Sequence, residues 1–370
     1  MAHRIEIDRR RRLAAEPHLG HNRYHPDIEP ILEVGEGEEV VIETRDALDG
    51  QIAFGDGAAV LETVDRGSTH PLTGPIHVKG AAPGDGLEIE FLEIEPQACG
   101  FSLIRPGIGF LRDVMTSPFL VHWEIADGWA TSAQIPGVRI PGAPFMGISA
   151  VAPSAKELAA WTAREARLVE RGGLALPPDP DGAVPGGACG LAGLRTMPPR
   201  ENGGNFDVKQ LTKGVKLILP VFTEGALFST GDGHFAQGDG EVCVTAVEVG
   251  ATVAVRFRVL KGAFAQRRFK APIFTREDYF ADPRFAAPQR LLGVMGIPVD
   301  ADGENRGEDL TLACRNAVLN MMELLMERGY DREQAYVICS VAVDLRISNV
   351  VDVPNFVVSA LLPEAIFDGD

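Results

Sequence analysis

Short apolar runs that alternate with polar positions occupy most of the first 270 residues, and glycine, proline or aspartate separates them. Three segments share one design, in which a Gly/Asp turn leads directly into an alternating apolar run: residues 32–44, 78–92 and 236–247. Side chains along a strand point to opposite faces in turn, so this alternation is typical of a half-buried strand. The repeated design predicts a mainly β fold with a sandwich-like or barrel-like core.

Helical patterns are fewer and have clear ends. Ser154 and Glu157 form a capping box, and the sequence after them favours a helix as far as Arg171. Apolar residues recur at helical spacing over residues 308–328, and Asp331 is placed to cap a second helix. These helices predict a smaller C-terminal α/β subdomain beside the β core.

The chain of 370 residues exceeds the usual size of a single hydrophobic core, so several subdomains are expected. We divide it into a β-rich N-terminal part (1–150), a helix followed by a long Gly/Pro-rich loop (151–204), a second β-rich part (205–270) and an α/β part (271–370). The density of glycine and proline predicts that residues 172–204 form a loop without regular structure. Long loops in compact domains commonly cover functional sites.

The charge and cysteine content narrow the class of protein. A net charge of −17 argues against nucleic acid or an anionic membrane as a partner. There is no secretory signal and no apolar run long enough to span a membrane. The five cysteines are widely spaced without a C-x-x-C pair, as expected of free thiols in a reducing compartment. We therefore expect a cytoplasmic protein, and a homo-oligomer because many β-rich enzymes of this size assemble.

The strongest concentration of polar side chains lies in residues 231–241. Asp232, His234, Asp239 and Glu241 are separated there by glycines, between apolar runs that we expect to be strands. A tight loop mounted on rigid strands can gather such side chains around one cation, and a mixed imidazole–carboxylate set suits zinc or another divalent metal. The same residue types also occur in ordinary turns, so spacing alone leaves both interpretations open.

Two further segments carry polar groups in turns. Asp46 and Gln51 follow the first predicted strand, and His70 begins a proline-stiffened loop. Each has an ordinary structural explanation as a turn residue. No Gly-x-Ser-x-Gly elbow and no phosphate-binding loop occur, which disfavours a serine α/β-hydrolase and a nucleotide triphosphatase.

The motifs themselves resemble those of the acetamidase/formamidase family. The segment 231–241, preceded by Leu-Pro-Val-Phe-Thr-Glu-Gly-Ala-Leu-Phe, is similar to the hallmark segment of that family. Other matching segments follow the same order along the chain and extend the resemblance to roughly residues 20–360: 21–27, 44–51, 70–75 with 80–85, 104–107, 144–147 with 151–153, and 203–207. The resemblance implies hydrolysis of small aliphatic amides, such as formamide or acetamide, to ammonia and the carboxylic acid.

The resemblance also implies which residues form the site. It places Asp46, Asp232, His234, Asp239 and Glu241 in the active site, with Asn205 and Asp207 lining it. We assign Gln51, His70, Asn205 and Asp207 to substrate binding.

In the expected mechanism, Asp46, Asp232 and His234 bind a divalent metal, zinc or calcium. Glu241 is expected to act as general base and then acid, while Asp239 orients His234 or the substrate amino group. The alternative is a cupin-like metal-binding β-sandwich protein, an oxygenase or a binding module without amidase activity.

Overall fold

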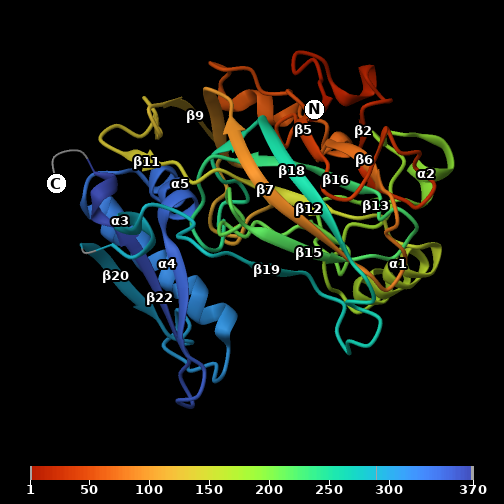
Figure 1. The fold of residues 1–370 in the computed structure, drawn as a ribbon. Coiled ribbons are helices and arrows are strands. Elements are labelled where there is room, and N and C mark those ends of the chain that lie inside the picture. Colours follow the sequence, from red (N-terminus) through yellow and green to blue (C-terminus); the bar gives the residue numbers. More distant parts are fainter. Residues whose placement is uncertain (1, 289, 368–370) are drawn as a thin grey trace.

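In the computed structural model, which describes residues 2–288 and 290–367, strands dominate the first two thirds of the chain and helices gather near the C-terminus (Figure 1). The strands are β1 (His3–Ile5), β2 (Gly20–His21), β3 (Arg23–Tyr24), β4 (Leu32–Val34), β5 (Glu39–Glu43), β6 (Leu72–Val78), β7 (Gly86–Pro96), β8 (Cys99–Ile104), β9 (Phe119–Ala126), β10 (Trp129–Thr131), β11 (Arg139–Pro141), β12 (Phe145–Ala150), β13 (Leu194–Arg195), β14 (Gly203–Asn205), β15 (Lys216–Pro220), β16 (Phe228–His234), β17 (Glu248–Val249), β18 (Ala251–Leu260), β19 (Ile273–Thr275), β20 (Leu291–Gly296), β21 (Asp344–Asn349) and β22 (Val357–Pro363). The α-helices are α1 (Ala155–Glu170), α2 (Gly187–Ala192), α3 (Pro283–Ala286), α4 (Leu310–Glu327) and α5 (Arg332–Ala342). The predicted mainly β fold with a smaller C-terminal α/β part is confirmed.

Two large sheets form the β core. One sheet has six strands in the order β1-β5-β18-β7-β15-β19. The other has eleven, in the order β11-β10-β9-β8-β17-β16-β12-β14, with β6 joining β16 to β2 and β4. Ile42 and Val253 from the first sheet share a buried cluster with Phe145 and Phe228 from the second, so the sheets pack as a sandwich. Strands from residues 1–150 and 205–270 pair within both sheets.

The strands follow from the alternation in the sequence. In β18, Val253, Val255 and Phe257 are fully buried, while the residues between them are only partly buried. Burying a side chain of this size stabilises the fold by roughly 1.5–3 kcal/mol. The six-stranded sheet therefore gains stability from one face of each strand.

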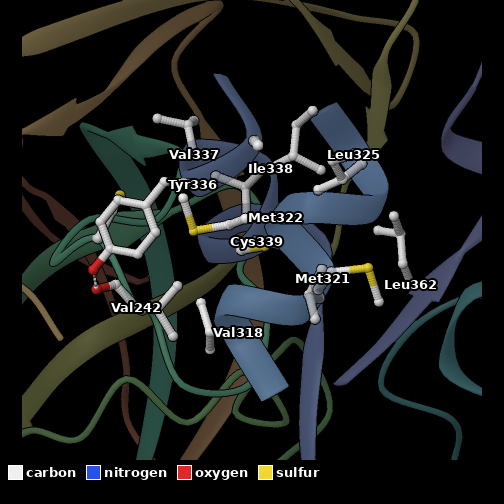
Figure 2. Packing of buried hydrophobic residues seen from close by; sticks show 14 of the residues in the cluster. Val242, Val318, Met321, Met322, Leu325, Tyr336, Val337, Ile338, Cys339 and Leu362 are labelled. Carbon is white, nitrogen blue, oxygen red and sulfur yellow. Dashed lines mark hydrogen bonds between the residues drawn. The ribbon is translucent and has the colours of Figure 1, made fainter. Parts of the chain in front are cut away.

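The C-terminal part combines a small sheet with two helices, drawn in blue (Figure 1). Its strands pair in the order β20-β22-β21, and α4 packs on β20 and β22. Helix α4 buries Met321, Met322 and Leu325, which pack with α5 residues in one apolar cluster (Figure 2). The caps are those expected from sequence: Ser154 begins α1, and Asp331 forms a capping box at α5.

Tyr336 of α5 joins this cluster to the β core. Its hydroxyl donates to the carbonyl of Val242 (Figure 2). The same hydroxyl accepts from the backbone nitrogen of Leu111 at 2.9 Å. Removing the hydroxyl leaves the buried backbone nitrogen of Leu111 without its acceptor, whereas the carbonyl of Val242 keeps its hydrogen bond from the backbone nitrogen of Phe110. We therefore expect Tyr336→Phe to destabilise the protein by about 1–3 kcal/mol. The midpoint of urea unfolding measures this loss. Tyr279→Phe, at a residue that is 76% exposed, is the control and should not shift the midpoint.

Two local predictions were wrong. Residues 172–204 contain α2, β13 and β14 rather than only loop. The apolar run 242–247 is not a strand; it is a loop that is buried except at Val244, and the next strand, β17, begins at Glu248. Apolar residues there fill the core through irregular backbone, which a strand-like sequence pattern does not distinguish from a true strand.

The structure agrees with two expectations from the sequence, which concern the cysteines and membrane-spanning segments. All five cysteines are free thiols. In the part of the chain that the structure describes, every helix is too short or too polar to cross a membrane.

Candidate active site

Asp232 and His234 lie at the end of β16, in the interior of the eleven-stranded sheet. Every residue of β16 is buried, and the strand pairs with β6, β12 and β17. Gly231 belongs to this strand, where a Cβ atom would lie 2.6 Å from the carbonyl oxygen of Pro71. This glycine therefore permits close strand packing. The expected tight loop at 231–234 is wrong; the irregular segment begins only after His234.

Gln237 fixes the tautomer of His234. The side-chain nitrogen of Gln237 donates to the carbonyl of Asp207 at 2.7 Å, so its Oε1 is the atom that faces His234. This oxygen lies 3.0 Å from Nδ1 of His234 and can only accept. Nδ1 therefore carries a proton, and in the neutral ring Nε2 presents a lone pair.

That lone pair faces carboxylates. Nε2 of His234 lies 3.2 Å from Oε2 of Glu248, 3.5 Å from Oδ1 of Asp232 and 3.9 Å from Oε1 of Glu241. Nε2 and the two nearer carboxylate oxygens are buried without a hydrogen-bond partner. A neutral imidazole beside buried anions is repulsive, so the arrangement needs a proton on Nε2 or a cation among these atoms.

Two overlapping sets of side chains can hold such a cation. One is Asp232, His234 and Glu248, and the other is Asp207, His234 and Glu241; in each set, one candidate ligand atom per residue lies within 4.8 Å of the others. Oδ1 of Asp207 is also buried and unpaired. Imidazole nitrogen with carboxylate oxygen is a donor set that zinc and other first-row divalent ions accept.

The pKa shifts describe a site with an excess of negative charge. Burial raises the pKa of Glu248 and of Asp207, each to about 7, and burial together with Asp207 raises the pKa of Glu241 well above its usual range. Burial also acts to raise the pKa of Asp232, but the neighbouring imidazoles lower it to about 2. Burial acts to lower the pKa of His234, but Glu248 and Asp232 raise it well above its ordinary value. The raised pKa values of Asp207, Glu241, Glu248 and His234 all favour additional positive charge in the cluster, whereas Asp232 stays ionised.

Backbone conformation at the site is unusual. Asp207, Asp232 and Glu241 have φ angles of 49°, 57° and 43°, in the left-handed region that non-glycine residues rarely adopt. Such conformations cost free energy and persist where the surrounding structure enforces them, commonly at functional sites. Here the three residues that adopt them all contribute carboxylates to the same cluster.

A cavity of about 130 Å³ leads to the cluster. Its wall includes Asp232, Glu241 and Glu248, together with His70 and Asn205. Nδ1 of His70 and Oδ1 of Asn205 are buried and unpaired, and burial lowers the pKa of His70. Unpaired donors and acceptors around a small cavity suit an uncharged polar ligand.

A second cavity, of about 220 Å³, lies between the β core and the C-terminal part. Trp129, Phe280 and Phe285 line it, and Gln237 reaches it. None of the clustered carboxylates lines this larger space. We therefore place the chemistry in the smaller cavity.

Gly147 of β12 provides the space in which the cluster forms. A Cβ atom there would lie 2.6 Å from Oδ1 of Asp207, 2.9 Å from Cε1 of His234 and 3.0 Å from Oδ2 of Asp232. Gly147→Ala should therefore displace site side chains and lower kcat/KM by about 100-fold, the usual consequence of misplacing a reacting group. Steady-state kinetics measure this effect. Gly57→Ala, where a Cβ atom meets nothing within 4 Å, should leave kcat/KM unchanged.

Three residues that were predicted for the site make other contacts: Asp46, Gln51 and Asp239. Asp46 accepts from the backbone nitrogens of Leu48 and Gly50, and it belongs to neither possible ligand set among the described residues. Burial and then Asp232 raise the pKa of Asp46, so the two carboxylates are near each other. Gln51 holds the backbone of its own loop through Leu48.

Asp239 does not contact His234. Its carboxylate lies 3.9 Å from Nζ of Lys209, and its backbone nitrogen donates to Asp344. Gln237 instead occupies the orienting position that the sequence assigned to Asp239. The irregular backbone after His234 turns Asp239 toward the C-terminal part.

The sequence analysis missed Glu248 and Gln237. Glu248 begins β17, beside β16 and β8, and is 2% exposed. A single carboxylate directly after the apolar run 242–247 was the available signal, because an acidic residue is rarely buried without a functional or ionic partner. Gln237 had only its spacing of three residues from His234 as a signal.

The chain has relatives among known proteins. The model of the acetamidase/formamidase family matches residues 6–369. An acetamidase from Mycolicibacterium smegmatis is 38% identical over 363 residues, covering 90% of this chain and 88% of that protein. A formamidase from Methylophilus methylotrophus is 34% identical over 370 residues, covering 95% of this chain and 90% of that protein.

A solved structure extends the agreement to three dimensions. The gamma lactamase from Delftia acidovorans superimposes with a TM-score of 0.93 at 36% identity, covering 100% of this chain and 94% of that chain. Sequence and fold thus match over nearly the entire length. The chain belongs to the acetamidase/formamidase family.

Proposed function

We propose that this protein hydrolyses the C–N bond of small amides, releasing ammonia and the carboxylic acid, at the cluster around His234. The observation that carries the proposal is the buried Nε2 of His234, which faces Asp232 and Glu248 at the cavity wall. Relatives named acetamidase and formamidase support this bond as the target. The gamma lactamase supports it too, because a lactam is a cyclic amide.

The residues that would hold a divalent cation are Asp232, His234 and Glu248. Their ligand atoms are buried, unpaired and close together, which fits that role. The histidine favours zinc over calcium, since calcium in proteins takes oxygen ligands. When bound, such a cation polarises the amide carbonyl and lowers the pKa of water.

The remaining side chains serve binding and proton transfer. Amide resonance makes the carbonyl a weak electrophile and the amine a poor leaving group, so a proton must move from water to nitrogen. Glu241 lies in the cavity wall and beside the cluster, where it can take the proton from water and deliver it to the departing nitrogen. Asn205 and His70, also in the wall and with unpaired polar atoms, would hydrogen-bond the amide. Burial, and after it the charge of Asp207, raise the pKa of Glu241 and so keep this side chain basic.

The test is product analysis with the purified protein. We expect ammonia and acid in equal amounts from formamide and acetamide, loss of this activity after treatment with a chelator, and recovery on adding zinc. With a γ-lactam, the ring-opened amino acid should form without ammonia. Absence of hydrolysis of every amide by the zinc-loaded protein would refute the proposal. Bound iron without ammonia release would support the cupin-like alternative, which the family match does not favour.

The cytoplasmic location and the homo-oligomeric state remain predictions from composition and size. Fractionation of cells and light scattering of the purified protein test them.

A further inference from the structure

Two arginines stand at the outer end of the active-site cavity. Arg105 follows β8 and is half-buried, whereas Arg66 is exposed, and both line the same cavity as Asp232 and Glu241. The acidic cluster is buried at the inner end. The cavity is therefore negative at its inner end and positive at its outer end.

Neither guanidinium has an acidic partner. Within residues 2–288 and 290–367, neither Arg66 nor Arg105 forms a side-chain hydrogen bond or an ion pair. Burial lowers the pKa of Arg105, and the charge of Arg66 lowers it further. Two adjacent cations without a counter-ion are unusual in a chain with a net charge of −17. Such a pair suits an anion that arrives from solution.

Apolar side chains occupy the wall together with these two charged regions: Leu61, Val64, Leu103, Ile108, Met197 and Val244. The volume of about 130 Å³ holds roughly ten water-sized groups, taking about 10–15 Å³ for each. Formamide and acetamide fill less than half of it. The cavity thus has room for a polar head, a short carbon chain and a terminal group.

We propose that the preferred substrates are amides whose acyl chain ends in a carboxylate, the mono-amides of short dicarboxylic acids. The amide enters the cluster around His234, the carbon chain lies along the apolar wall, and the carboxylate binds Arg66 and Arg105. Water adds to the carbonyl, the C–N bond breaks, and nitrogen leaves as ammonia with the proton taken from water. This inference rests on the amidase function proposed above and names the substrate class of the same site.

Matched substrates test the proposal in the zinc-loaded, wild-type protein. Succinamate and butyramide have the same number of carbons but differ in the terminal carboxylate, as do glutaramate and pentanamide. We expect kcat/KM to be at least about tenfold higher for the charged member of a pair, mainly through a lower KM, since charge-assisted hydrogen bonds of arginine are strong. Raising the salt concentration to about 0.5 M should reduce the advantage, because the arginines are partly exposed.

Variants assign the effect to the two arginines. Arg66→Gln/Arg105→Gln should lower the succinamate-to-butyramide ratio of kcat/KM by at least about tenfold. Arg112→Gln, an exposed arginine outside the cavity, is the matched control and should keep the ratio. If the double variant does not fold, Arg66→Gln alone, at an exposed position, should still lower the ratio.

The outcomes separate the two proposals. Acetamide hydrolysis with equal kcat/KM for succinamate and butyramide would overturn the inference and leave the amidase function intact. A preference for succinamate that survives in both arginine variants would also overturn it. Failure to hydrolyse any amide would overturn the amidase function itself.

Discussion

Glu241→Gln is expected to lower kcat for acetamide by at least about 100-fold, because a positioned general base commonly contributes 10²–10⁴ in rate. This loss corresponds to about 2.7 kcal/mol of transition-state stabilisation. Glutamine keeps the size of the side chain but cannot take a proton from water. Glu241 lies 3.9 Å from Nε2 of His234, on the cavity side of the cluster. The steady-state rate of ammonia release at saturating acetamide gives kcat.

The matched control is Asp239→Asn. Asp239 is two residues away, yet its carboxylate lies near Lys209 and not in the cavity. We expect this variant to keep kcat within about threefold, as removal of a partly exposed charge contact changes little. Zinc content should stay at the wild-type level in both variants. A Glu241→Gln enzyme with wild-type turnover would refute the base assignment, and one that loses zinc would make Glu241 a ligand instead.

Much of the fold could be predicted because its signals are local. The cap at Ser154, the capping box at Asp331 and the alternation in residues 78–92 each depend on residues close in sequence. Residues 231–234 and 242–247 could not be assigned in this way. Gly231 and Gly233 in β16 reflect the close approach of neighbouring strands, and the apolar loop reflects packing under α5. Both causes lie far away in sequence.

The site was predictable only where one motif carries it. Asp232, His234 and Glu241 lie within ten residues of one another, so their sequence pattern identified them. Glu248 joins them because β17 pairs with β16, and sequence spacing does not reveal that pairing. Asp46 and Asp239 have the right chemistry, but their backbones direct them to other partners. Which carboxylates lie close enough to His234 to bind a metal is therefore decided by tertiary contacts, which the sequence pattern does not reveal.

The sequence predicts Asp46 as a metal ligand, whereas the structure brings Glu248 to His234, so Glu248→Gln is the sharpest test of the metal site. One oxygen of Glu248 accepts from the backbone nitrogen of Ala246 at 2.9 Å, a contact that glutamine can keep. The other oxygen faces Nε2 of His234 at 3.2 Å and would lose its charge. Loss of an outer contact already costs a metal site about 10–100-fold in affinity, so loss of a ligand charge should raise the Kd for zinc by at least about 100-fold.

Asp46→Asn separates the structural assignment from the one based on sequence. Asparagine can still accept from Leu48 and Gly50, and Asp46 lies outside both ligand sets of the described residues. We therefore expect the Asp46→Asn variant to bind zinc with a Kd within about threefold of wild type, because the charge that it loses does not belong to a ligand of the cation. Competition with a coloured chelator measures this Kd. If Asp46→Asn lost zinc while Glu248→Gln kept it, the cation would be held by the residues that the motifs suggested. The carboxylate facing His234 would then have to owe its burial to a protonated imidazole rather than to a metal.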